Sequence, residues 1–216
     1  RATDPGATMA HLARTDMQSS LMMVMGFGWS GWAILTIGAA VAGWIDAVIG
    51  GGGLVLIPLI MAVAPQLAPA AALATNKVAA VSGTASAAIT LVKKVRPPKG
   101  ELIRMGLLAL ACSSLGATAV ALIDKDIMRP VIIVLMVAVG TFVAFRPSFG
   151  SGEGEGIRGG WRTWAGLAAV AAIAFYDGVF GPGTGMFLIM AFTAIFSQNF
   201  LTSAAMSKVV NTCTNV

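Results

Sequence analysis

The chain has 216 residues, of which 57% are hydrophobic and 11% are charged, and its net charge is +5. A soluble domain has about 25% charged residues, so this composition excludes a water-soluble fold. Continuous apolar runs approach the length of about 20 residues that a membrane helix needs, whereas a membrane β-barrel would show short alternating segments. The composition therefore predicts an all-α integral membrane protein.

A polar stretch, residues 1–20, precedes the first apolar run. Because the chain begins with Arg1 and not methionine, its start is expected to be processed or missing. The run from Leu21 to Ile45 has no charge and is too long for the core of a signal peptide, so it predicts a membrane helix. Together, the apolar runs and their breaks predict helices at about 22–49, 54–64, 70–92, 105–123, 129–145, 164–180, 186–196 and from 200 onward.

Two polar segments interrupt these runs. The sequence "KKVRPPKGELIR", residues 93–104, has five basic residues and one acidic residue, Glu101. A basic loop between apolar segments is typical of the cytoplasmic side of a membrane, which is a better interpretation than a nucleic-acid site. The glycine-rich linker at 146–162 is also expected to be cytoplasmic, and it separates one membrane segment, 21–145, from another, 163–216.

The two membrane segments resemble each other. "GWIDAVIGGGGL" at 43–54 aligns without a gap with "AFYDGVFGPGTG" at 174–185, an offset of 131 residues. The pattern predicts a duplicated helical repeat with glycine-broken helices in each half. The second copy lacks the equivalents of residues 86–146, so repeat 2 is expected to be incomplete at its C-terminal end. Whether the repeats are parallel or inverted stays open.

The charged residues within the long apolar stretches follow the same offset. Asp46 and Asp177 are 131 positions apart, and so are Lys77 and Lys208. A charge at the centre of a membrane helix costs about 2.5–3.5 kcal/mol on insertion scales and by default marks a substrate or ion path. We therefore predict that these four residues are functional.

The glycine runs at 50–53 and 181–185 are the first candidate site. Glycines break helices, and irregular backbone at membrane depth is tolerated only where it is buried in protein or lines a cavity. The helix that follows presents free N–H groups and its positive dipole end to an anion, and paired breaks in two halves indicate a transporter's binding site. A tight turn or close helix packing is the alternative. The candidate substrate-binding residues here are Gly50, Gly51, Gly52, Gly53, Gly181, Gly183, Thr184 and Gly185.

The repeated lysines are the second candidate site. Their ammonium groups could meet an anionic substrate, or they could form structural pairs within each repeat, Lys77 with Asp46 and Lys208 with Asp177. Both interpretations stay open, with the aspartates as charge partners or carriers of a coupling proton. The polar neighbours singled out as substrate-binding are Asn76, Ser207 and Asn211.

The sequence has few residues that could bind a metal ion or support catalysis. The one histidine, His11, lies in the polar N-terminal stretch, and Cys112 and Cys213 lack metal-ligand spacing. No nucleophile–base pair is recognisable. We expect no metal, no cofactor and no enzyme activity.

At these motifs the sequence resembles the TauE/SafE family of sulfite-exporter-like membrane permeases. The resemblance rests on "GWIDAVIGGGGLVLIPLI" followed by "ALATNK", and on "FYDGVFGPGTGMFLIMAF" followed by "SAAMSKVVN". It covers roughly residues 29–216. It implies a secondary transporter in the cell (inner) membrane that moves sulfite, thiosulfate or organosulfonates.

The expected function is therefore a multi-pass permease that binds a small anion between two glycine-broken repeats. Its expected partners are the anionic substrate and the lipid bilayer, with no nucleic acid, and a homo-oligomer is possible. The alternative is a non-transporting membrane subunit of a larger complex, in which the charges are structural pairs.

Overall fold

The computed structural model describes residues 28–120, 122–123, 125–145 and 160–216. The chain divides into two compact units, residues 1–37 and 38–216. Of the first unit the structure describes residues 28–37, most of which belong to the start of a helix. The polar stretch 1–20 and nearly all of the linker 146–162 lie outside the described residues.

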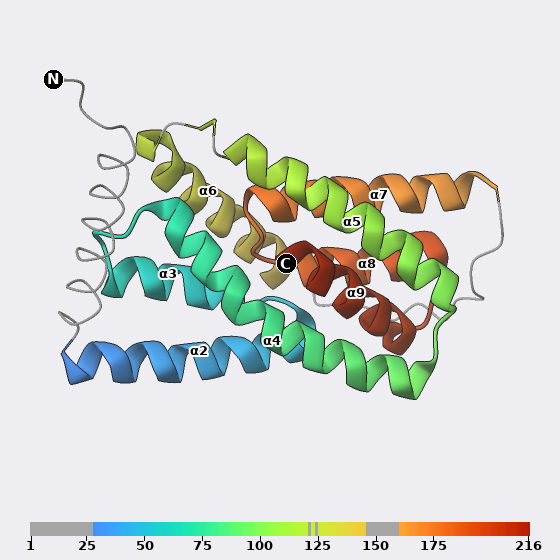
Figure 1. The fold of residues 1–216 in the computed structure, drawn as a ribbon, viewed down its shortest axis with the longest axis horizontal. Helices are drawn as coiled ribbons and strands as arrows, with labels where there is room; N and C mark the ends of the chain where they lie inside the picture. The colour runs from blue at the N-terminus through green and yellow to red at the C-terminus, as the bar shows by residue number, and fades with distance from the viewer. Residues whose placement is uncertain (1–27, 121, 124, 146–159) are drawn as a thin grey trace, which may run out of the picture. The chain divides into compact units, whose positions relative to one another are not determined.

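All regular secondary structure in the described ranges is helical, as predicted (Figure 1). The helix bounds agree with the predicted ones to within four residues except around the basic segment, and the predicted start of the first helix, 22–27, lies outside the described residues. The helices are α2 (Trp29–Ile49), α3 (Gly53–Val63), α4 (Pro69–Val95), α5 (Lys99–Val120), α6 (Lys125–Ala144), α7 (Trp161–Val179), α8 (Thr184–Phe196) and α9 (Phe200–Asn215).

The segment predicted as a basic loop at 93–104 is mostly helical, so that expectation is wrong in its extent. Lys93 and Lys94 form the last turn of α4, and α5 already begins at Lys99. The turn between them is short, and Arg96 within it has a left-handed conformation with φ 53°, outside the helical region that Pro97 disfavours in the residue before it. The positive charges thus cluster at two helix ends that meet in a tight turn.

The surface of the second unit is apolar where a soluble protein would be polar. Ile103 and Leu107 on α5 and Val134 and Val137 on α6 are all more than 60% exposed. Three described helices, α2, α4 and α5, are long and apolar enough to cross a membrane. Large exposed apolar faces on such helices are expected when lipid is the solvent.

Helix α9 shows the complementary pattern, because it is rich in small and polar residues yet largely buried. Its buried residues include Ser203, Ser207, Asn211 and Thr214. It packs along α4, α5 and α8. In a membrane protein the polar residues gather inside the bundle, so α9 lies where a polar pathway would be expected.

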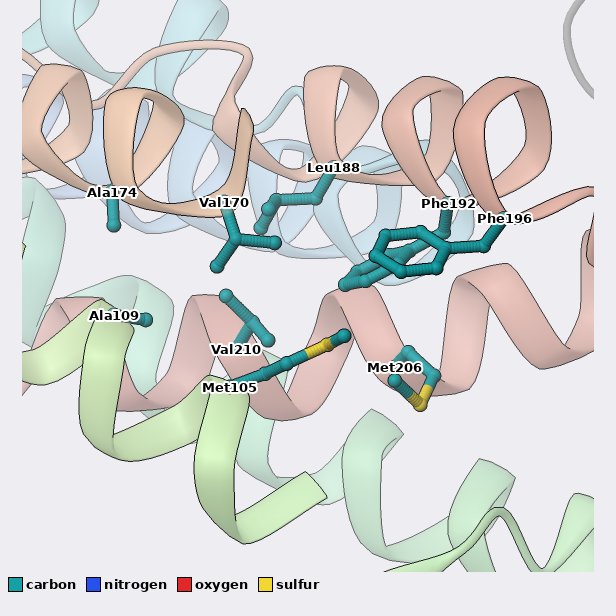
Figure 2. Packing of buried hydrophobic residues seen from close by; sticks show 9 residues of the cluster. All are labelled: Met105, Ala109, Val170, Ala174, Leu188, Phe192, Phe196, Met206 and Val210. Atoms are coloured by element: carbon teal, nitrogen blue, oxygen red, sulfur yellow. The ribbon is translucent and has the colours of Figure 1, made fainter. Parts of the chain in front are cut away.

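The larger apolar core joins four helices. Figure 2 shows Met105 of α5, Val170 of α7, Phe192 of α8 and Val210 of α9 directed toward one another. Apolar side chains gain little by leaving apolar lipid, so such a core stabilises the bundle mainly through close packing. The core fixes α7, α8 and α9 relative to α5, and it thereby positions the second glycine segment.

Helices α5 and α7 approach closely through two glycines. A Cβ added to Gly178 would lie 2.0 Å from the carbonyl oxygen of Ser113, and one added to Gly116 would lie 2.2 Å from that of Phe175. Small residues at such a crossing let two backbones touch. The crossing leads directly into Asp177, so it also sets the place of that carboxylate.

We expect Gly178→Ala to destabilise the protein by about 1–3 kcal/mol, the usual cost of overpacking, because the new methyl would meet backbone that cannot move aside. Gly83→Ala is the matched control, because a Cβ there has open space and alanine is the better helix former by about 1 kcal/mol. The measurement is unfolding of the detergent-solubilised protein by SDS titration. Equal stability of the two variants would contradict the close crossing.

Candidate functional site

The two glycine segments lie against each other in the structure. A Cβ added to Gly50 would lie 2.6 Å from the Cα of Gly185, and one added to Gly185 would lie 2.6 Å from the Cα of Gly50. Gly50 and Gly181 have positive φ angles of 82° and 95°, a conformation that costs glycine little. The sequence therefore needs glycine here both for backbone conformation and for contact between the segments.

Each break is followed by a short helix. Helix α3 has 11 residues and α8 has 13, which at about 1.5 Å per residue is roughly 16–20 Å. The hydrocarbon core of a bilayer is about 30 Å thick. Neither helix is long enough to span it, so one end of each must lie inside the membrane or within the protein.

Asp46 belongs to the last turn of α2, and its side chain lies at the start of α3. Its Oδ1 accepts a hydrogen bond of 3.2 Å from the backbone N–H of Gly52, while its Oδ2 is buried without a hydrogen-bond partner. The residue is 7% exposed. A carboxylate is favourable at the positive end of a helix, but the second oxygen is not satisfied by the protein.

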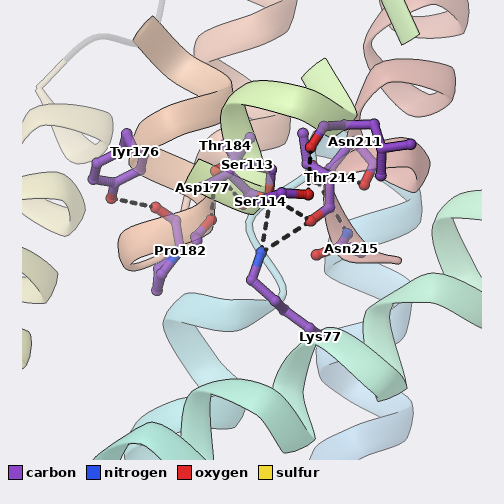
Figure 3. Close-up of polar contacts among 12 residues, drawn as sticks. Lys77, Ser113, Ser114, Tyr176, Asp177, Pro182, Thr184, Asn211, Thr214 and Asn215 are labelled. Carbon is purple, nitrogen blue, oxygen red and sulfur yellow. Dashed lines mark hydrogen bonds and ion pairs between the residues drawn. The ribbon is translucent and has the colours of Figure 1, made fainter. Parts of the chain in front are cut away.

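Asp177 belongs to the last turn of α7, and its side chain lies in the corresponding place at the start of α8. Its Oδ1 accepts a hydrogen bond of 2.7 Å from the Thr184 hydroxyl, and its Oδ2 accepts one of 2.8 Å from Lys77 Nζ. Figure 3 shows Lys77 reaching from α4 toward Asp177 and Thr214. Both oxygens of this buried carboxylate are therefore satisfied.

Each lysine contacts the aspartate residue of the other segment, so the interpretation of structural pairs within each repeat is wrong. Lys77 forms its ion pair with Asp177, and Lys208 Nζ donates a hydrogen bond to the main-chain oxygen of Asp46. The offset of 131 residues identified the charges, but their pairing follows from how α4 and α9 cross the glycine segments. The two lysines thus join the two segments.

The two lysines differ in surroundings. The Lys77 side chain is 19% exposed and is neutralised by Asp177. Lys208 is 0% exposed, and in the part of the chain that the structure describes no carboxylate oxygen is in contact with its Nζ. A buried ammonium without a contacting anion is costly, which makes Lys208 the stronger candidate for substrate binding.

The backbone amides expected to hold an anion are partly engaged already. The Gly52 N–H serves Asp46, and the Thr184 N–H donates to the carbonyl of Gly181. The protein's own carboxylates thus lie at the positive helix ends where the sequence predicts that the substrate binds. An incoming anion would have to share this space with Asp46 or Asp177, so the lysines are needed to balance the charge.

The other predicted residues divide between the centre and the periphery of this site. Ser207 lies at the contact of the two segments and donates to the carbonyl of Gly185. Asn76 and Gly53 lie together beside Asp46. Gly51 faces Met186.

Two predicted residues contact neighbours other than the four charged residues. Asn211 was expected near Lys208, but its Oδ1 accepts from Asn215 and Thr214 instead. Gly183 faces Val139 of α6. Position along a helix predicts which face a residue shares, but it does not predict which neighbour the side chain selects.

Sequence reasoning missed three contributors. The carbonyl oxygen of Thr214 accepts from both Lys77 and Ser113, and Tyr176 donates to the carbonyl of Pro182 within the second glycine segment (Figure 3). Tyr176 could have been found, because it is the only tyrosine in the chain and adjoins Asp177. Nothing in the sequence distinguishes Ser113 or Thr214 from other small polar residues in these helices.

Among the described residues, no group of three or more histidine, cysteine or carboxylate side chains is placed to hold a metal ion. Cys112 and Cys213 are free thiols there. The groups that the site does offer are ammonium and carboxylate charges, amides and hydroxyls. These groups can bind and exchange ions and protons.

Comparison with known proteins finds relatives of this chain among membrane transporters. A family model described as "Sulfite exporter TauE/SafE" matches residues 35–216. The chain is 32% identical over 184 residues to the probable membrane transporter protein YfcA of Escherichia coli (strain K12), a match that covers 85% of this chain and 66% of that protein. It is 30% identical to the probable membrane transporter protein ORF9 of Sinorhizobium sp, covering 85% of this chain and 69% of that protein. A probable membrane transporter protein of Haemophilus influenzae is 33% identical, with 85% and 71% covered.

The chain thus spans about two thirds of the length of the curated relatives it matches. No solved structure matches it.

Proposed function

Because the chain belongs to the sulfite exporter TauE/SafE family, we propose that it is a secondary transporter that moves small anions across the cell (inner) membrane. The substrates that fit are sulfite, thiosulfate and organosulfonates, since these are compact anions that an ammonium group and backbone amides can bind. Relatives named as probable membrane transporters support transport.

The transporter is built from a duplicated helical repeat. Helices α3 and α4 begin at Gly53 and Pro69, and helices α8 and α9 begin at Thr184 and Phe200. Both starts are therefore displaced by 131 residues, from 53 to 184 and from 69 to 200, the same offset as the charges. The equal spacing supports two related units, 21–145 and 163–216, whose broken helices face each other.

The substrate site lies where the two glycine segments meet. The observation that carries this proposal is Lys208, a fully buried ammonium at the contact of the segments with no carboxylate in contact among the described residues. Intramembrane charges of this kind mark substrate paths. Lys208 attracts the anion, Ser207 and the amides around Gly185 orient it, and Lys77 with Asp177 holds the segments in place.

The ion pair between Lys77 and Asp177 favours a second candidate, a membrane subunit in which the charges only fasten helices together. The two functions differ in what Lys208 must do. In a structural subunit its charge could be replaced by an apolar side chain without functional loss, whereas in a permease it could not.

The orientation follows from charge. The tight turn at 96–98, flanked by Lys93, Lys94 and Lys99, is placed on the cytoplasmic side. Helices α5 and α6 then return the chain to the same side at 146–162. A cysteine at Ser151, in a variant whose two native cysteines are replaced by serine, should react with a membrane-impermeant maleimide only when the cytoplasmic face is accessible. Labelling from the outer face of intact cells would show that the protein has the opposite orientation.

Transport itself is tested in vesicles. The intact protein, reconstituted in liposomes, should take up radiolabelled thiosulfate, and excess sulfite or methanesulfonate should compete. Empty liposomes and liposomes with the Lys208→Met variant are the controls. Absence of uptake above empty liposomes, when each of the three anions is radiolabelled in turn, would refute the substrate class.

A further inference from the structure

The strongest asymmetry in the site is between its two aspartates. Asp177 has a partner for each oxygen, Thr184 for Oδ1 and Lys77 for Oδ2. Asp46 has one for Oδ1 only, and its buried Oδ2 has none. Leaving a buried charged oxygen without a partner costs free energy. The two aspartates therefore have different roles, although they occupy equivalent positions in the repeat.

A small pocket lies beside Asp46. It has a volume of about 30 Å³ and lies among the end of α2, the start of α3 and the middle of α4. A buried water needs at least about 10–15 Å³, so the pocket has room for one or two waters and none for an organic anion. Its lining is Asp46, Asn76, the backbone of Gly52 and Gly53, and otherwise alanines, Gly43 and Leu56.

The lining also bears on which ion enters. Hard metal cations take six or more oxygen ligands, and this pocket offers few polar groups besides Asp46 and Asn76. A proton needs only one oxygen and a water that delivers it. The pocket therefore fits a proton site better than a metal-cation site.

We propose that Asp46 is the proton-coupling residue of the transporter, loaded through water in this pocket, and that Asp177 is not. The proton leaves a hydronium ion or water, forms an O–H bond at Oδ2, and converts the carboxylate to a neutral acid. The inference rests on the proposed transport of an anion.

The neighbouring charges explain how proton and anion are linked. Lys208 of α9 attracts the charge of Asp46, and Asp177 of α7 repels it. Lys77 of α4 is neutralised by Asp177, and α3 and α8 have no titratable residue. When Asp46 becomes neutral, Lys208 is left as an uncompensated cation, so anion binding is strengthened. By reciprocity the bound anion favours protonation of Asp46.

The proposal predicts that the affinity of the intact protein for thiosulfate rises from mildly alkaline to mildly acidic pH, on the order of 5- to 150-fold, the usual size of such coupling. Asp46→Asn imitates the neutral acid, so its affinity should be high and independent of pH. Glu101→Gln, the same change at a carboxylate on α5 outside the pocket, is the matched control and should keep the pH dependence.

A second readout does not depend on transport. Infrared difference spectra of the protein in detergent should show the carbonyl band of a protonated carboxylic acid that appears as pH falls. Asp46→Asn should lack this band, and Asp46→Glu should restore one. Appearance of the band without thiosulfate binding would support the proton site while refuting the proposed substrate. Persistence of the band in Asp46→Asn, or thiosulfate affinity that follows sodium rather than pH, would overturn the proposal.

Discussion

Replacing Lys77 by methionine should lower the free energy of unfolding by about 3–5 kcal/mol, the usual cost of removing one partner from a buried ion pair. The reason is the aspartate that remains. Asp177 is 1% exposed, and without the ammonium its Oδ2 has no charge partner in a site that water does not reach freely. Lys94→Met is the matched control, because Lys94 lies near the end of the same helix and is exposed. It should change stability little.

A double-mutant cycle then identifies the partner. If Lys77 pairs with Asp177, the double variant Lys77→Met with Asp177→Asn leaves no lone charge and should recover most of the lost stability. Combining Lys77→Met with Asp46→Asn should bring no such recovery. SDS-induced unfolding of the detergent-solubilised variants measures all of these values. Recovery with Asp46 instead of Asp177 would contradict the pairing between the segments.

The sequence predicts the positions of the site's charges better than their partners. Glycine runs end helices for local reasons, so the starts of α3 and α8 follow from residues 50–53 and 181–185. The charges stand out because they interrupt apolar runs. The partner of Lys77, however, depends on how α4 crosses α9 beside the second glycine segment, and no local pattern encodes that crossing.

The carboxylates at the helix starts show a second limit. The sequence places Asp46 six residues before Gly52, and Asp177 seven residues before Thr184. A helix leading into a sharp glycine turn can bring such residues back to the new helix start, as the hydrogen bonds show. The same N–H groups could serve a substrate or the protein's own acid, and only the folded geometry distinguishes the two.

The basic turn illustrates how local chemistry can mislead. Charge density at 93–104 predicts the side of the membrane and suggests a loop. Lysine is a good helix former, however, and basic residues are favourable in the last turn of a helix, so α4 continues through Lys93 and Lys94. The helix therefore extends past the first basic residues and ends only just before the prolines.

Lys208→Met should impair substrate binding and leave the stability of the protein nearly unchanged, whereas Lys77→Met should lower the stability. Lys208 is fully buried and contacts a main-chain carbonyl rather than a carboxylate among the described residues. Its removal costs one hydrogen bond and the attraction that Lys208 exerts on Asp46, but it also relieves the desolvation of a buried charge. Asp46 can then bind a proton and lose its own charge. We therefore expect a change in unfolding free energy of less than about 1 kcal/mol.

Thiosulfate uptake by the same variant should fall sharply. Losing the charge partner of a buried anion costs about 2–5 kcal/mol of binding, which is a loss on the order of 30-fold or more in affinity. Met206→Leu is the matched control, because Met206 is equally buried on the same helix and a change between two apolar residues of similar volume should keep uptake. If the Lys208→Met variant transported normally, Lys208 would not be part of the substrate site. Its charge would then be better explained by the role of a structural subunit. A variant that is stable yet inactive, beside an unstable Lys77→Met, would show that one lysine of the repeat fastens the segments while the other binds the anion.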